Sequence, residues 1–196
     1  MFEIRLAQTQ QELDDLYRFR YRIYVEEMGR VQLDADHERK TIQDALDEHG
    51  HNLLAFRYGK LVGAARINFN ELCTPFYYEL YQMNNQSVVT NKNASIVTRL
   101  MIDETYRKST LAVRIFIACY EFGLWRGIRC NFVDCNDHLI DFFKSFGYQH
   151  YIGKATHKEY GEVNPLKLDL HDEALFRQIN SPFLKPYLAW KHQQDY

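Results

Sequence analysis

The sequence predicts one α/β domain that spans residues 1–196. Segments with the 3.6-residue period of amphipathic helices alternate with short runs of β-branched and aromatic residues, which is typical of a sheet flanked by helices. The composition of 46% hydrophobic and 26% charged residues is that of a globular protein, and a chain of this length buries roughly 70% of its unfolded surface. No internal repeat or Ser/Gly-rich linker divides the sequence, so we expect a single domain.

The composition excludes several classes of function. With 24 basic and 26 acidic residues, the chain has no surplus of positive charge for binding nucleic acid. No apolar run approaches the roughly 20 residues that cross a bilayer, so we expect no transmembrane segment. The four cysteines form neither a CxxC pair nor a Cys/His metal spacing, which favours a reduced, cytoplasmic location and no bound metal. The 15% aromatic content suits a dense core or an apolar pocket.

The first predicted element is a helix at residues 10–28. Thr9 and Glu12 have the spacing of a capping box, and apolar residues follow at helical intervals. Gly29 supplies a residue that readily adopts the left-handed conformation found after many helices. The polar segment that follows has room for one or two helical turns at 38–48.

A hairpin and a long insertion follow. The strand-like runs 51–58 and 61–69 meet at Gly59-Lys60, which predicts a β-hairpin. Residues 70–94 have no clear period and are expected to form a long insertion with a short helix. Long ordered loops are often functional.

The second half of the chain alternates strands and helices. The segment 109–126 is apolar nearly all round, which predicts a buried helix. The other expected elements are strands at 95–103, 130–135, 148–153 and 166–170, a polar turn at 104–108, helices at 137–146 and 172–179, and an aromatic tail.

The order of these elements resembles the GCN5-related N-acyltransferase superfamily. The more specific pieces are Arg107–Ala112 (RKSTLA), which opens the apolar helix, and Phe142–Tyr148 (FFKSFGY), which matches a late helix-Gly-aromatic element. The resemblance implies an α/β fold with a central mixed sheet flanked by helices, and the activity of an acyltransferase.

Within that superfamily, two branches are most similar. The first half resembles the autoinducer (acyl-homoserine-lactone) synthases, and the tail from Val163 to Phe183 resembles the long-chain N-acyl amino acid synthases of the N-acyltyrosine type. The matching residues of the first half are Arg20 and Tyr24 in the run FRYRIYVEEMG, the D-x-x-D pair Asp44 and Asp47, Arg66 after the hairpin, and the strand pair Thr98-Arg99.

Some positions differ from the sequence patterns of the acetyl-CoA-dependent N-acetyltransferases and of the lactone synthases. Thr110 stands where acetyl-CoA enzymes carry the first glycine of R-x-x-G-x-G/A, and Phe143 stands where a tyrosine often protonates the leaving thiolate. Arg30 and Ile96 replace the tryptophan and the glutamate of the lactone synthases. The departures argue against acetyl transfer and against lactone synthesis.

Arg20 falls within the apolar stripe of the first predicted helix, where a guanidinium must find a partner. One interpretation is a structural ion pair with Asp44 or Asp47. The other is a charged cluster that lines an acceptor cleft and holds the carboxylate and ammonium of an amino acid. The two are compatible. The resemblance assigns acceptor binding to Arg20, Tyr24, Asp44, Asp47 and Arg66, and places Thr98 and Arg99 at the catalytic position.

The turn 107–111 precedes the apolar helix, whose first amide groups lack intrahelical partners and whose dipole end is positive. Such a turn can hold a phosphate, although Ser109 can equally be an ordinary N-cap. Asn136, after the strand 130–135, can bond the pantetheine arm or cap the next helix, and we expect the cap. The resemblance assigns pantetheine and carrier contacts to Leu100, Met101, Arg107, Lys108, Ser109, Thr110 and Leu111.

The sequence thus predicts an enzyme that transfers a long acyl chain from acyl carrier protein to an amino acid, with tyrosine or another aromatic or apolar residue as acceptor. An acyl-phosphopantetheine thioester is the co-substrate, and no tightly bound cofactor is expected.

The eight histidines are interpreted as solvated and the cysteines as core residues. Alternatives are a lactone synthase, an acetyl-CoA-dependent N-acetyltransferase and a non-enzymatic carrier-binding module. The basic residues expected to meet an acidic carrier are Arg18, Arg22, Arg107, Lys108 and Arg114.

Overall fold

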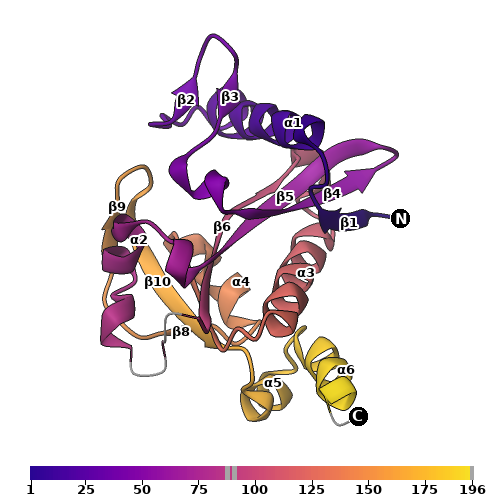
Figure 1. Ribbon diagram of the computed structural model, residues 1–196, viewed down its shortest axis with the longest axis vertical. Helices are drawn as coiled ribbons and strands as arrows, with labels where there is room; N and C mark the ends of the chain where they lie inside the picture. Colours follow the sequence, from indigo (N-terminus) through magenta and orange to yellow (C-terminus); the bar gives the residue numbers. More distant parts are fainter. Residues whose placement is uncertain (87–88, 90–91, 195–196) are drawn as a thin grey trace. The chain divides into compact units, whose positions relative to one another are not determined.

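The computed structural model describes residues 1–86, 89 and 92–194 (Figure 1). These residues form two compact units. Unit 1 comprises Met1–Ile67 and Arg99–Ala118, and unit 2 comprises Asn68–Thr98 and Cys119–Tyr196. The single domain expected from the sequence stays a prediction.

The strands form a mixed sheet in the order β1-β4-β5-β6-β7-β10-β8, with β9 paired to β10. β6 and β7 run parallel, whereas β1–β4, β4–β5, β7–β10 and β10–β8 are antiparallel. The α/β class with a central mixed sheet and flanking helices is therefore confirmed. The strands are β1 (Glu3–Leu6), β2 (Ala35–Asp36), β3 (Thr41–Ile42), β4 (His51–Arg57), β5 (Lys60–Phe69), β6 (Ala94–Ile102), β7 (Cys130–Cys135), β8 (Gln149–His150), β9 (Ala155–His157) and β10 (Gly161–Asp169).

Six α-helices accompany these strands in the part of the chain that the structure describes. None of them is long and apolar enough to cross a membrane. They are α1 (Gln10–Tyr21), α2 (Pro75–Leu80), α3 (Leu111–Trp125), α4 (Ile140–Lys144), α5 (Glu173–Ile179) and α6 (Leu184–Gln194).

The helix α1 begins where the capping pattern predicts it. The Thr9 side chain accepts a hydrogen bond from the Glu12 amide, which satisfies one of the free donors of the first turn. The α-helical geometry ends at Tyr21 and continues as a π-helix over Arg22–Glu27, a rare form that often occurs at functional sites. Gly29 then adopts a φ of 62°, as expected for the residue that ends the helix.

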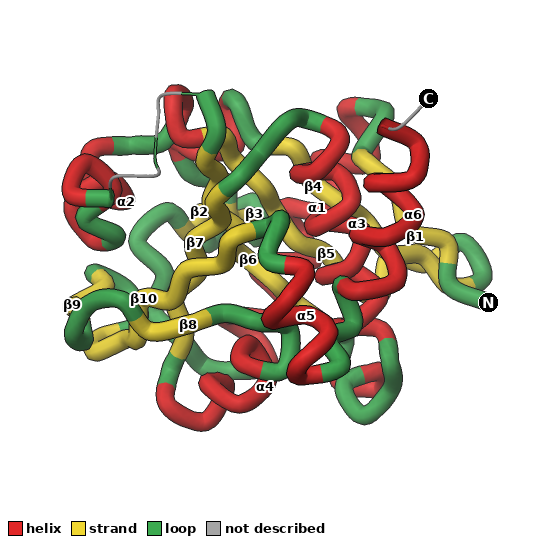
Figure 2. The backbone as a smooth tube through the Cα atoms, turned by 90° about the horizontal axis from the view of Figure 1, so that it is seen from below, coloured by secondary structure: helices red, strands yellow, loops and turns green. Residues whose placement is uncertain are grey.

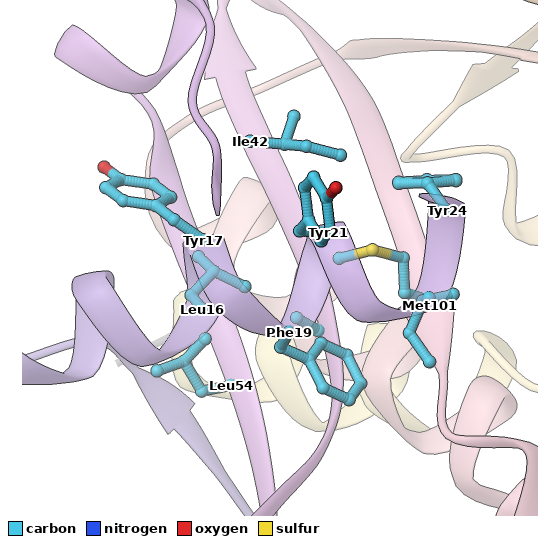
Figure 3. Packing of buried hydrophobic residues seen from close by; sticks show 10 residues of the cluster. Leu16, Tyr17, Phe19, Tyr21, Tyr24, Ile42, Leu54 and Met101 are labelled. Atoms are coloured by element: carbon cyan, nitrogen blue, oxygen red, sulfur yellow. The ribbon is translucent and has the colours of Figure 1, made fainter. Parts of the chain in front are cut away.

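The apolar face of α1 forms the core of unit 1. Leu16 and Phe19 on α1 pack with Leu54 of β4 and Met101 of β6 in one buried cluster, together with Ile42 of β3 (Figure 3). Burial of each such side chain contributes about 1.5–3 kcal/mol. This packing fixes α1 against the sheet and so fixes the position of the arginine that shares its buried face.

The core of unit 2 is largely aromatic. Figure 2 shows the strands of this unit in yellow. Tyr120 and Phe183 stack with ring centroids 4.1 Å apart, and Phe146 and Phe176 also contact Phe183. The helix α6 carries Tyr187 into the same cluster. The high aromatic content of the sequence thus serves, in large part, as core.

Five elements were not predicted from the sequence. The strands β1, β2, β3 and β9 are only two to four residues long, too short to show a period. The aromatic tail, for which no secondary structure was predicted, forms the helix α6. Its apolar residues contact the aromatic core without forming a clear stripe, so the sequence period did not reveal it.

Candidate functional site

A buried ion network occupies unit 1, and Arg20 of α1 is one of its members. Its Nη1 and Nη2 donate to the two carboxylate oxygens of Asp47 at 2.6 and 2.8 Å, and Nη2 also donates to Asn52 Oδ1 at 2.9 Å. The Arg20 residue is 0% exposed. The prediction of a buried arginine on the apolar stripe, with an aspartate partner, is therefore confirmed.

The D-x-x-D pair is a helical cap. Asp44 precedes the short 3-10 helix Ala45–Glu48, and its Oδ1 accepts from the Leu46 amide at 3.0 Å. Asp47, three residues later, accepts from the Asp44 amide at 3.0 Å. This reciprocal capping box fixes both carboxylates in one turn. The spacing of two aspartates therefore has a structural cause as well as a chemical use.

Arg66 of β5 joins both aspartates. Its guanidinium donates to Asp44 Oδ1 at 2.6 Å and Asp44 Oδ2 at 3.1 Å, and Nη1 lies 2.9 Å from Asp47 Oδ1. Gly50 makes this approach possible, because a Cβ at that position would lie 2.7 Å from Arg66 Cδ. The bidentate geometry is the strong form of an arginine–carboxylate contact.

Arg99 of β6 completes the network from a strained backbone conformation. Its φ is 56°, which is uncommon for a non-glycine residue inside a strand and costs about 1–3 kcal/mol. Its Nη2 donates to Asp44 Oδ2 at 2.8 Å, its Nη1 donates to Gln32 Oε1, and the guanidinium lies 5.4 Å from the centroid of the Tyr24 ring. Strain of this kind tends to cluster at functional sites.

The network holds three guanidiniums and two carboxylates, so its charged side chains have one excess positive charge. The arginines lower the pKa of Asp44 and of Asp47 even though burial acts in the opposite direction. Arg20, Asp47 and Arg66 have side chains that are at most 1% exposed. The side chains of Asp44 and Arg99 are 14% and 5% exposed. These two therefore form the accessible edge of the network.

The other predicted site residues lie on β6 and at the start of α3. Thr98 is the last residue of unit 2 and precedes Arg99 in β6. Leu100 is half-buried, and Met101 belongs to the core cluster of unit 1. Only the backbone of Met101 can therefore contact a ligand without disturbing this packing.

Side chains of the turn before α3 already form hydrogen bonds with some of its backbone groups. Ser109 Oγ accepts from the Leu111 amide at 3.2 Å and donates to the Tyr106 carbonyl at 2.6 Å, which agrees with a helix-capping role. Arg107 donates to the Ile102 carbonyl at 3.1 Å and forms an ion pair with Glu27. Lys108 and Thr110 are exposed.

Several polar groups of unit 2 escaped the sequence analysis. His157 is 1% exposed rather than solvated, and its Nδ1 accepts from the Glu159 amide at 3.1 Å. Asn136 occupies the N-cap position of the next helical segment, but its side chain makes no capping hydrogen bond and instead donates to the Glu162 carbonyl. Tyr81 donates to Asp134 at 2.6 Å, and burial raises the pKa of that carboxyl.

The cysteines have the structural character expected from their context. All four are free, and Cys119, Cys130 and Cys135 are buried. Burial raises the pKa of each of these three thiols to about 12. They are therefore not thiolate nucleophiles at neutral pH. Residues 1–86, 89 and 92–194 contain no cluster of His, Cys, Asp and Glu side chains that could hold a metal ion.

Comparison with protein families decides the class. Residues 15–169 match the model of the N-acyl amino acid synthase FeeM family. The chain belongs to this family. It is an acyltransferase, and the matched range contains the whole ion network and the turn before α3. A comparison with curated protein sequences gives no match.

Solved structures support the fold. The CoA-dependent acyl-homoserine lactone synthase BjaI, with SAM and isopentyl-CoA, superimposes with a TM-score of 0.70 at 18% identity, covering 93% of this chain and 90% of that one. FeeM, from uncultured soil microbes, gives a TM-score of 0.67 at 15% identity, covering 89% and 94%. ElaA of Escherichia coli gives 0.62 at 17% identity, covering 86% of this chain and all of its own.

Arg20→Ala is expected to destabilise unit 1 strongly, because it leaves the buried Asp47 without its bidentate partner. Breaking a buried ion pair in this way costs about 3–5 kcal/mol. The matched control is Arg18→Ala, two residues away on the same helix, where an exposed arginine pairs with an exposed Asp15. This control should change the free energy of unfolding little. Urea denaturation of both variants measures the difference. Equal midpoints would contradict the placement of Arg20.

The network also predicts how stability depends on pH. The folded-state pKa values of Asp44 and Asp47 are lowered, so the stabilisation is complete above the unfolded value of about 3.9 and is lost as the pH falls further. Each carboxyl contributes a slope of up to about 1.4 kcal/mol per pH unit. Denaturation curves between pH 6 and pH 2.5 should show this loss, and Asp44→Asn should reduce the slope. Parallel profiles for the two proteins would show that Asp44 is not responsible.

Proposed function

We propose that this protein is a long-chain N-acyl amino acid synthase that uses an acyl carrier protein thioester as donor. The observation that carries the proposal is the buried network of three arginines and two aspartates in unit 1, with Asp44 and Arg99 at its accessible edge, within a chain of the FeeM family. An arginine at such an edge can hold a carboxylate in bidentate geometry. The carboxylate of a free amino acid meets this requirement.

The acceptor would bind at the accessible edge of the network. Arg99 would hold its carboxylate, and Asp44 would lie close to its ammonium or amine group. Arg20, Asp47 and Arg66 keep Asp44 in place through the contacts described above, and Tyr24 lies beside the Arg99 guanidinium. An aromatic or apolar side chain, such as that of tyrosine, is the expected class of acceptor.

The donor would reach the site as acyl-phosphopantetheine. Leu100 and Met101 would contact the pantetheine arm through their backbones, and the turn Arg107–Leu111, of which residues 107–110 are exposed, would hold its phosphate at the start of α3. Thr110 at the first glycine position of the CoA loop favours a protein carrier over CoA. The phosphate would have to share Arg107 with Glu27, its present partner.

The reaction is aminolysis of a thioester. The unprotonated amine of the acceptor attacks the carbonyl carbon, an N–C bond forms, the C–S bond breaks, and the amine loses a proton while the thiolate leaves. Positioning of the two reactants supplies much of the rate, and amide donors near Thr98 and Arg99 would stabilise the oxyanion. Because a thiolate is a good leaving group, Phe143 in place of a tyrosine is compatible with turnover.

The donor is expected to carry an acyl chain much longer than acetyl. The altered glycine loop and the aromatic residues on α1 and α2 motivate this expectation. Carrier thioesters of two to sixteen carbons, competed against one another with an amino acid mixture, should give mainly long-chain N-acyl products by mass spectrometry. A preference for acetyl would contradict the proposal, as would binding of the thioester without any turnover.

The carboxylate of the acceptor is expected to be essential. Tyrosinamide lacks that charge and should react more slowly than tyrosine by about 1.5–3 kcal/mol in transition-state free energy, which is the usual contribution of a charged hydrogen bond. Rates with both acceptors, measured with one carrier thioester at one salt concentration, isolate this contribution. Equal rates would remove the carboxylate contact and favour an amine without a carboxylate as acceptor.

A further inference from the structure

A second group of arginines in unit 1 has no carboxylate partner among the described residues. The guanidiniums of Arg57 and Arg114 lie 5.0 and 5.6 Å from the centroid of the Phe2 ring, and Arg57 also lies 4.9 Å from Tyr58 and 6.0 Å from Tyr106. Arg114 donates to the Phe2 carbonyl at 3.3 Å. We call Phe2, Arg57, Tyr58, Tyr106 and Arg114 the Arg57–Arg114 patch.

The pairing of other basic residues shows why this patch is different. Arg18 pairs with Asp15, Arg22 with Asp103, and Arg107 with Glu27. These three arginines, together with Lys108 and Arg114, were expected from the sequence to face an acidic carrier. Their charge is already offset within the chain, whereas the charges of Arg57 and Arg114 are not.

The patch is built on ordered elements near the surface. Phe2 precedes β1, which pairs with β4, and Arg57 ends β4 directly opposite Lys60 of β5 (Figure 1). Residues opposite each other on antiparallel strands share one face of the sheet, so Lys60 adds a third cation there. Arg114 and Lys60 are exposed, and Tyr58 is 85% exposed. Glu104 lies in the same short 3-10 helix as Tyr106.

Two guanidiniums held against the same ring repel each other. The faces of Phe2, Tyr58 and Tyr106 offset part of this repulsion through cation–π contacts, but they do not neutralise the charge. The rings also limit the motion of the two arginines, so less side-chain entropy is lost when a partner binds. Positive charge that is ordered and unpaired at the surface favours a partner with a complementary acidic surface.

We propose that the Arg57–Arg114 patch is the docking surface for the acidic face of the acyl carrier protein, an inference that rests on the proposed function. Its position supports this partner. Tyr106 immediately precedes the Arg107–Leu111 turn, to which we assign the pantetheine phosphate, and Arg114 lies in the first turn of α3. A carrier on the patch would therefore present its phosphopantetheine arm close to that turn.

The experiment uses charge-reversal variants and two kinds of donor. Arg57→Glu and Arg114→Glu should each raise the KM for the acyl carrier protein thioester at least about tenfold, with little change in kcat. The reason is that surface charges act mainly on the rate at which two proteins associate. The same variants should retain the parent KM for acyl-pantetheine, which has no carrier. Arg18→Glu, at an arginine that is exposed but paired, is the matched control and should change neither. Arg57→Gln and Arg114→Gln remove the charge without reversing it and should have smaller effects of the same sign.

Direct binding of holo-carrier to each variant, followed by fluorescence anisotropy at several salt concentrations, provides a readout that needs no turnover. The parent affinity should fall with added salt, and the two Glu variants should bind weakly at all concentrations. Parent-like affinity in these variants overturns the proposal. A larger increase in KM for acyl-CoA than for the acyl carrier protein thioester also overturns the proposal. It would show that the patch binds the nucleotide part of CoA instead. Failure of every donor to give N-acyl amino acid would instead refute the proposed function, while the binding data would still test the patch.

Discussion

The rest of unit 1 depends on the contact between three arginines and two aspartates that belong to one capping box. Removing these five charges from water is expensive, and the cost is recovered only when every guanidinium finds a well-placed carboxylate. The turn Asp44–Asp47 provides this placement because its own backbone hydrogen bonds orient both side chains. Arg20 of α1, Arg66 of β5 and Arg99 of β6 then converge on it from three elements. A shift of any one element would leave a buried charge without its partner.

This constraint explains features that have no obvious reason by themselves. A glycine fits at position 50 because a Cβ there would lie 2.7 Å from Arg66 Cδ. Arg99 accepts a left-handed backbone conformation inside a strand, and its hydrogen bonds to Asp44 and Gln32 hold it there. Stability by itself does not require such a network, since apolar residues of similar volume often stabilise a core as well. A ligand that needs the charge, as in the proposed function, would account for such a network in an acyltransferase.

Much of this network could be predicted from the sequence, because its elements have short-range patterns. The helical period placed Arg20 on the buried face of α1, and the resemblance supplied Asp44 and Asp47, whose capping role only the structure shows. Resemblance supplied Arg66 and Arg99, which periodicity does not distinguish from other strand arginines. The strained φ of Arg99 had no signal at all, because it results from tertiary contacts.

The features that sequence reasoning missed depend on contacts between distant segments. His157 looked solvated in a polar stretch, yet it stacks on Tyr160 and packs edge-on against Phe76. Asp134 lies in an apolar strand, and its hydrogen-bond donor Tyr81 comes from the insertion before β6. Likewise, the sequence shows which residues are cations but not which of them are already paired. Only the structure separates Arg22 and Arg107, which have carboxylate partners, from Arg57 and Arg114, which have none among the residues that the structure describes.

The two groups of arginines in unit 1 differ in their surroundings, and this difference determines what each can recognise. In the buried network, ions of the solvent have little access, so its electrostatic interactions are strong at short range and depend weakly on salt. A small anion with a defined geometry, such as an amino acid carboxylate, is the suitable ligand. The Arg57–Arg114 patch is at the surface, where interactions are weaker individually and are screened within about 10 Å at 0.1 M salt. Several charges of a partner must then act together, which a protein surface provides and a small acceptor does not. The same formal charge therefore favours a substrate in one place and a macromolecule in the other.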